Sequence, residues 1–125
     1  MYGEGDMERL QDNIAGSLYF YRAKCVSVYD GDTVRLDIML GLDVVLSNVS
    51  CRLYGINTPE LRGDDKDAGI AARNRLRQLV LGEDIIIQTH KDRRGKYGRY
   101  LATLWCLGIN INKKLIAEGH AVPYA

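Results

Sequence analysis

The stretch LYFYRAKCVSVYDGDTVRLDIML, residues 18–40, decides the fold. Its first part, Leu18–Tyr29, is rich in aromatic and β-branched residues and is typical of a strand. Asp30-Gly31 is then a strong signal for a hairpin turn. From Asp32 to Leu40 apolar and polar residues alternate, which predicts a second, half-buried strand. The stretch therefore predicts an antiparallel hairpin as the first unit of the fold.

The rest of the chain extends this hairpin into a small barrel. Further strands are predicted over Val44–Gly55, Glu83–His90 and Tyr97–Leu107. Apolar residues at helical spacing predict one helix over Asp64–Leu81 and a shorter one over Asn110–Glu118. Five short strands with a helix after the third favour a mainly β, α+β architecture of the oligonucleotide/oligosaccharide-binding (OB) kind, with one or two short helices near the C-terminus.

Length and composition predict a single domain over residues 16–125. A chain of 125 residues can bury a core without disulfides or a structural metal. None of its apolar runs approaches the roughly 18 residues of a membrane span, and a monomer is the default for its size. Residues 1–15 carry four acids against Arg9 alone and are expected to form a flexible acidic tail.

The cysteines indicate a reducing compartment. Cys25, Cys51 and Cys106 are far apart, odd in number and set in apolar or strand-like runs, so buried free thiols are expected. The acidic start does not resemble a signal peptide, which favours a cytoplasmic location, although a presequence removed earlier is left open.

The net charge does not indicate a nucleic-acid-binding protein, but the distribution of the charged residues does. The formal net charge is +1, but a basic run lies between His90 and Arg99, made of Lys91, Arg93, Arg94, Lys96 and Arg99 against Asp92. Such a run is often only a solvated hairpin tip. Tyr97 and two glycines within it also suit contact with phosphate.

Three clusters carry the candidate chemistry. They are Val28-Tyr29-Asp30-Gly31-Asp32-Thr33-Val34, Arg52-Leu53-Tyr54-Gly55-Ile56-Asn57-Thr58-Pro59-Glu60 and Lys96-Tyr97-Gly98-Arg99. Singly, each has an ordinary structural explanation as a turn, an ion pair or a hairpin corner. Together, in this order and spacing, they resemble the staphylococcal nuclease family from about Cys25 to about Tyr124.

The resemblance implies an OB barrel that binds one Ca²⁺ ion and hydrolyses DNA and RNA to products with 3′-phosphates. Asp32 resembles the carboxylate ligand of the metal, and Thr58 the residue that offers its backbone carbonyl. Asn57 stands where the family usually has a second aspartate ligand, so weaker metal binding is expected. Asp30 resembles an acid that lies behind the metal ligands.

The same resemblance implies the catalytic and substrate-binding residues. Arg52 and Arg99 resemble the two arginines that hold the phosphate, and Glu60 the acid that handles the attacking water. Tyr97, beside Lys96, resembles a tyrosine of the phosphate site. Tyr124 is a candidate for a second such tyrosine, although the local alignment slips by one residue.

Phosphodiester chemistry independently requires these residue types. The transition state concentrates negative charge, which an oxygen-bound dication and bidentate guanidinium groups stabilise. A carboxylate one water away can orient or deprotonate the nucleophile. We therefore expect a Ca²⁺-dependent phosphodiesterase or endonuclease.

Two other classes are weighed against the enzyme. Nuclease-like barrels that have lost catalytic positions serve as nucleic-acid-binding modules, but this chain retains Arg52, Glu60 and Arg99. A protein that acts only as a structural partner would be favoured by a large exposed apolar patch on the barrel. The sequence does not distinguish DNA from RNA or endo- from exo-action.

Overall fold

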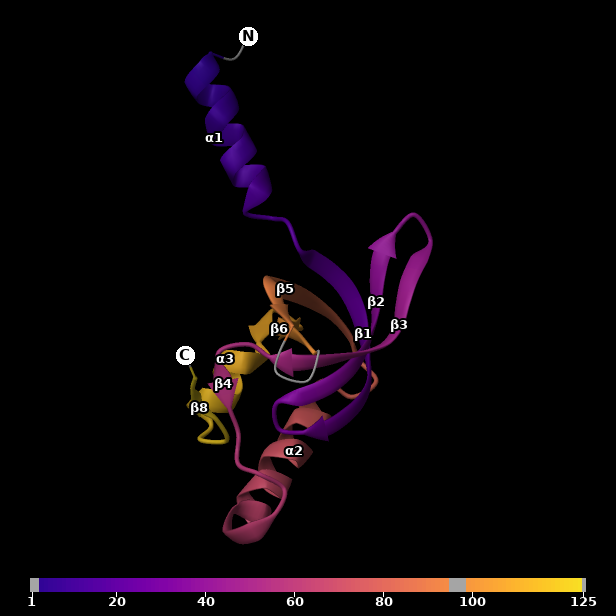
Figure 1. Ribbon diagram of the computed structural model, residues 1–125, viewed down its shortest axis with the longest axis vertical. Coiled ribbons are helices and arrows are strands. Elements are labelled where there is room, and N and C mark those ends of the chain that lie inside the picture. The colour runs from indigo at the N-terminus through magenta and orange to yellow at the C-terminus, as the bar shows by residue number, and fades with distance from the viewer. Residues whose placement is uncertain (1–2, 95–98, 125) are drawn as a thin grey trace.

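The computed structural model describes the backbone of residues 3–94 and 99–124. Its central element is a closed five-stranded barrel (Figure 1). The barrel strands are β1 (Phe20–Asp30), β2 (Thr33–Gly41), β3 (Val44–Leu53), β5 (Asp84–Arg94) and β6 (Tyr100–Cys106). Antiparallel pairing joins them in the order β3-β2-β1-β5-β6, and a parallel pairing of β3 with β6 closes the ring. The predicted OB class is confirmed.

Shorter elements complete the chain. Strand β4 (Ile56–Asn57) pairs with β8 (Val122–Pro123), and β7 (Ile109–Asn110) pairs antiparallel with β6. A 3₁₀ turn, η1 (Gly63–Asp65), leads into helix α2 (Lys66–Val80), and α3 (Ile111–Ala117) follows β7. The two predicted helices are therefore present within two residues of their expected ends, whereas the sequence analysis did not predict β4, β7 or β8.

The turn of the first hairpin lies one residue later than its sequence signal predicts. Asp30 pairs with Thr33, so that Gly31 and Asp32 form the turn. Gly31 does not adopt a positive φ angle. A Cβ atom at this position would instead lie 2.8 Å from both the Ala72 methyl group and the Thr58 hydroxyl. The glycine is required here because the turn packs closely against α2 and against the loop that follows β4.

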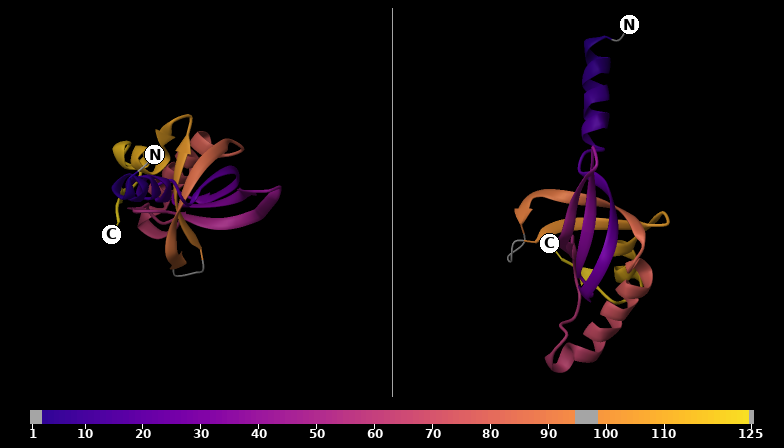
Figure 2. Two further views of the ribbon diagram at one scale, coloured as in Figure 1. Left: turned by 90° about the horizontal axis from the view of Figure 1, so that it is seen from above. Right: turned by 90° about the vertical axis from the view of Figure 1, so that its right-hand side faces the viewer.

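Helix α2 covers one end of the barrel (Figures 1 and 2). It buries Ala72, Leu76 and Val80, and Arg77 donates to the Val28 carbonyl of β1 at 3.1 Å. Its first residue follows Asp65, whose carboxylate makes no capping hydrogen bond with a described residue. Asp64, Asp65 and Asp67 therefore contribute charge near the N-terminus of the helix, but Asp65 makes no side-chain cap.

Helix α3 is fixed to the barrel by one buried amide. The Asn112 side chain donates to the carbonyls of Tyr54 and Ala102, and it accepts from Leu104 N–H at 3.0 Å. Because every polar group of the amide is engaged, it can be buried without an unpaired donor or acceptor. It ties α3 to β6 and to the end of β3.

The segment expected to be an acidic tail forms helix α1 (Glu4–Ala15). The helix projects away from the barrel (Figures 1 and 2), and all of its residues are exposed. The residues are thus exposed and have regular structure, while their flexibility stays a prediction. Within the described part of the chain, no helix is long and apolar enough to cross a membrane.

The core lies inside the barrel and beneath α2. Its largest fully buried side chains include Leu36, Leu53, Leu76, Ile87 and Leu104. Cys25, Cys51 and Cys106 are buried free thiols, as predicted, and burial raises the pKa of Cys25 to about 11. Trp105 is half-buried on the outer face of the barrel, with its ring centroid 5.6 Å from that of Phe20.

Candidate active site

Asp32 lies at the centre of the candidate site, buried in the turn between β1 and β2. Its backbone carbonyl accepts from Leu53 N–H at 2.8 Å, which anchors the turn to the end of β3. Its carboxylate oxygen Oδ2 accepts from Thr58 N–H at 3.1 Å and lies 3.4 Å from Arg52 Nη2. The end of β3 and the loop that follows β4, both distant from Asp32 in the sequence, therefore fix the position of this residue.

Arg52 joins Asp32 to Asn57. It lies near the end of β3, and its Nη2 also donates to Asn57 Oδ1 at 3.1 Å. One nitrogen thus contacts both the carboxylate and the amide oxygen, which places these two oxygens around a common point. The sequence-predicted residues Asp32, Arg52, Asn57 and Thr58 are brought together.

Arg99 reaches the same turn from the β6 side of the barrel. Its Nη1 donates to Thr33 Oγ1 at 3.1 Å, and Thr33 Oγ1 lies 3.4 Å from Asp32 Oδ1. The barrel closure explains this arrangement, because β6 pairs in parallel with β3 beginning at Cys51 and Tyr100. The two predicted arginines therefore contact adjacent residues of one turn.

Glu60 lies in the loop that follows β4, two residues after Thr58, and its side chain is exposed. It lines a cavity of about 270 Å³ together with Asn57, Thr58 and His120. Its backbone is held by α2, because a Cβ at Gly69 would overlap the Glu60 carbonyl oxygen.

Among the predicted substrate-binding residues Lys96, Tyr97 and Tyr124, the structure describes Tyr124. The Tyr124 ring lies 5.1 Å from the Arg52 guanidinium carbon, and Tyr124 N–H donates to the Gly55 carbonyl at 2.8 Å. The predicted candidate is thus adjacent to the arginine through a cation–π contact. Lys96 and Tyr97 lie outside the described residues.

The electrostatics of the turn favour a cation. Asp32 N–H donates to Asp30 Oδ1 at 3.1 Å, so the two acids lie side by side. Burial, together with the charge of Asp32, raises the pKa of Asp30 to about 6. This shift reflects crowded, partly desolvated negative charge that a cation would stabilise.

The donor set fits Ca²⁺. Carboxylate, amide and backbone carbonyl oxygens are the ligands that Ca²⁺ prefers. Asp32 Oδ2 and Asn57 Oδ1 already face one cationic nitrogen, which shows that both can be directed at a positive charge. The described residues do not include a group of three or more His, Cys, Asp or Glu side chains able to hold a metal, so a site here depends on Asn57 and on backbone oxygen.

Sequence reasoning missed the residues that position the site. Thr33 carries the contact of Arg99, and Gly31 and Gly69 let the turn and α2 approach the Thr58–Glu60 loop. A signal for Gly69 was present, because a glycine inside a helix costs roughly 1 kcal/mol relative to alanine and usually has a packing reason.

The fold and the site define an OB-barrel protein with two arginines and two acids gathered at the first hairpin turn. The sequence model described as "Staphylococcal nuclease homologue" matches residues 50–125. The thermonuclease of Staphylococcus intermedius is 29% identical over 122 residues, which cover 95% of this chain and 67% of that protein. The chain belongs to the staphylococcal nuclease family and is a nuclease-like protein.

Proposed function

We propose that the protein is a Ca²⁺-dependent nuclease that hydrolyses phosphodiester bonds of DNA or RNA. The observation that carries this proposal is the convergence of Arg52 and Arg99 on Asp32 and Thr33, with contacts of 3.4 Å and 3.1 Å. Two guanidinium groups on one turn suit an anion with two non-bridging oxygens. The thermonuclease relative supports the same chemistry.

The metal would be held by the Asp32 carboxylate, the Asn57 amide oxygen and the Thr58 backbone carbonyl, with Asp30 behind them. When bound, the ion would neutralise part of the phosphate charge and orient the substrate. In this structure Arg52 Nη2 is engaged with Asp32 and Asn57. Arg52 must give up these contacts to reach a substrate phosphate.

Glu60 would act as the general base. The carboxylate accepts a proton from a water molecule that attacks phosphorus. The bond from phosphorus to the 5′-oxygen breaks, and the departing 5′-oxygen takes a proton from solvent, which leaves a 5′-hydroxyl and a 3′-phosphate. Such a base contributes about 10²–10⁴-fold to the rate. Arg52 and Arg99 would stabilise the charge that develops on the non-bridging oxygens, and removal of one such donor commonly costs about 10²–10³-fold.

A cleavage assay on single-stranded DNA and RNA tests the proposal. We expect cleavage with Ca²⁺, none with a chelator, and losses of about 10²-fold or more in Arg52→Gln and Arg99→Gln. Arg73→Gln is the matched control, because the Arg73 side chain contacts Asn74 on α2 and not the site.

The alternative is a nuclease-like module that binds nucleic acid without cutting it. The neutral Asn57 ligand favours this reading, because metal affinity depends on the charge of the ligands. Nucleic-acid binding without Ca²⁺-dependent cleavage at any Ca²⁺ concentration would establish the module and refute the enzyme.

A further inference from the structure

Helix α1 carries an apolar stripe that is exposed and has no partner among the residues that the structure describes. Met7, Leu10 and Ile14 recur at helical spacing and are 44%, 43% and 55% exposed. Residues three, four and seven apart lie on one face of a helix, so these side chains form a continuous strip. A short helix in water usually needs packing of such a face for stability.

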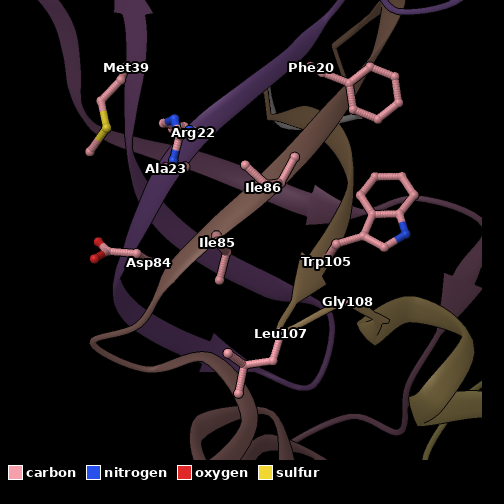
Figure 3. Close-up of a pocket in the computed structure, with 10 residues that line it drawn as sticks. All are labelled: Phe20, Arg22, Ala23, Met39, Asp84, Ile85, Ile86, Trp105, Leu107 and Gly108. Carbon is pink, nitrogen blue, oxygen red and sulfur yellow. The ribbon is translucent and has the colours of Figure 1, made fainter.

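The outer face of the barrel carries an apolar groove. We call it the β1–β5–β6 groove and define it by Phe20, Arg22, Met39, Ile86, Trp105 and Leu107, which line a cavity of about 630 Å³. Figure 3 shows Phe20 and Trp105 on one side of the groove, Met39 on the other and Ile86 between them. The strand registers explain the grouping, because Met39 pairs with Arg22, Arg22 with Ile86, and Ile86 with Trp105.

We propose that α1 of one copy docks in the β1–β5–β6 groove of a second copy, so that two chains form a reciprocal dimer. The proposal concerns an interaction surface and does not depend on nuclease activity. It departs from the monomer expected for a chain of this size.

The negative charge of α1 favours its docking in the groove over the packing of two α1 helices against each other. Helix α1 bears Glu4, Asp6, Glu8 and Asp12 against Arg9, so two copies packed together would repel. Within the groove, Arg22 makes no ion pair with another described residue. Asp84 lines the same groove and lies opposite Lys24 in the strand register.

The link between α1 and β1 favours exchange over folding back. Gly16 N–H, Ser17 N–H and Leu18 N–H all donate to carbonyls of the last helical turn at 3.0–3.1 Å. Thr89 N–H donates to the Tyr19 carbonyl at 2.9 Å, which ties the end of the link to β5. Figures 1 and 2 show α1 projecting away from the barrel, and these bonds hold the link that sets its direction.

The reciprocal exchange of two helices enlarges the contact area of the proposed dimer. A helix of 12 residues is about 18 Å long, too short for one docked copy to reach the roughly 1,600 Å² of a standard interface. A two-fold symmetric exchange uses the same contact twice.

Sedimentation of the full chain over a range of concentrations tests the dimer. We expect dimers for the wild type and an increase of at least about 100-fold in the dissociation constant for Leu10→Glu/Ile14→Glu and for Ile86→Glu. The helix variant cannot unfold the barrel through lost contacts, because no residue of α1 is buried. Gly5→Glu adds an acid on the opposite face of α1 and should leave the dimer unchanged.

Mixing the variants identifies the contact. The helix variant retains an intact groove and the Ile86→Glu variant an intact helix, so the mixture should associate more strongly than either variant alone. Trp105, the only tryptophan, lines the groove, and its emission should shift to shorter wavelength as wild-type concentration rises. A wild type that is monomeric at all concentrations, or an Ile86→Glu dimer as strong as wild type, would overturn the proposal.

Discussion

Gly69 of α2 lies against the backbone carbonyl of Glu60. A methyl group at position 69 would overlap the carbonyl oxygen and would lie 2.7 Å from the carbonyl carbon. The absence of a side chain near the start of α2 therefore lets the helix approach the backbone of the candidate general base. This contact links the packing of α2 to the chemistry at the barrel end.

The substitution Gly69→Ala should impair both stability and cleavage. Overpacking against backbone typically costs about 1–3 kcal/mol, which exceeds the gain of up to about 1 kcal/mol in helix propensity. A displacement of Glu60 by about 1 Å should lower turnover by up to about 10²-fold. Thermal unfolding and cleavage rates check this. Gly5→Ala, in a helix glycine with open space around it, should change neither the barrel nor the rate.

Asn57→Asp should strengthen Ca²⁺ binding. The substitution adds a negative charge next to Asp32, and affinity rises with ligand charge, so a gain of roughly 10-fold is expected. Calorimetric titration of Ca²⁺ into both proteins measures it. Unchanged affinity would show that position 57 does not contact the metal.

Two buried threonines should behave oppositely when each is changed to valine. Thr58 Oγ1 is buried without a hydrogen-bond partner among the described residues, so Thr58→Val should leave cleavage intact and raise metal-free stability by up to about 1 kcal/mol. Thr33 Oγ1 accepts from Arg99, so Thr33→Val should reduce cleavage by roughly 10-fold. Equal rates in the two variants would contradict these roles.

The ion pair between Arg75 and Glu118 should make stability depend on pH. Hydrogen bonds of 2.6 and 2.9 Å from Arg75 lower the pKa of Glu118 to about 2 from its ordinary 4.5. Because the folded pKa is depressed, the stabilisation is fully present above about pH 4.5 and is lost as the pH falls through about 2.

The check for this pair is Glu118→Gln. Its melting temperature should lie below that of the wild type near neutral pH, and the two should converge in strong acid. Glu8→Gln on α1, outside any contact with the barrel, is the control. A difference that persists below pH 2 would mean that the carboxylate charge is not the cause.

Local signals predicted the barrel strands because each carries its own alternation and turn residues, as in the segment around Asp30-Gly31. The parallel pairing of β3 with β6 could not be read in the same way, because it joins Cys51 to Tyr100 across an intervening helix and strand. Helix α1 was missed because its four acids suggested a tail, although Met7, Leu10 and Ile14 have helical spacing.

The residue types of the candidate site were predictable from the sequence, but the packing contacts that position them were not. Resemblance identified Asp32, Arg52 and Arg99, and the structure brings them to one turn. Close approaches such as that of Gly31 to Thr58 depend on three-dimensional packing, which periodicity does not describe.

The most direct test of the account is the turnover of Glu60→Gln compared with its affinity for single-stranded nucleic acid. We predict that kcat falls by about 10²–10⁴-fold while binding changes little, because the carboxylate acts on water and not on the phosphate. Glu83→Gln, a change of the same type in the exposed residue before β5, should retain wild-type turnover. Cleavage by Glu60→Gln at the wild-type rate would contradict the catalytic role of Glu60 and the mechanism built on it.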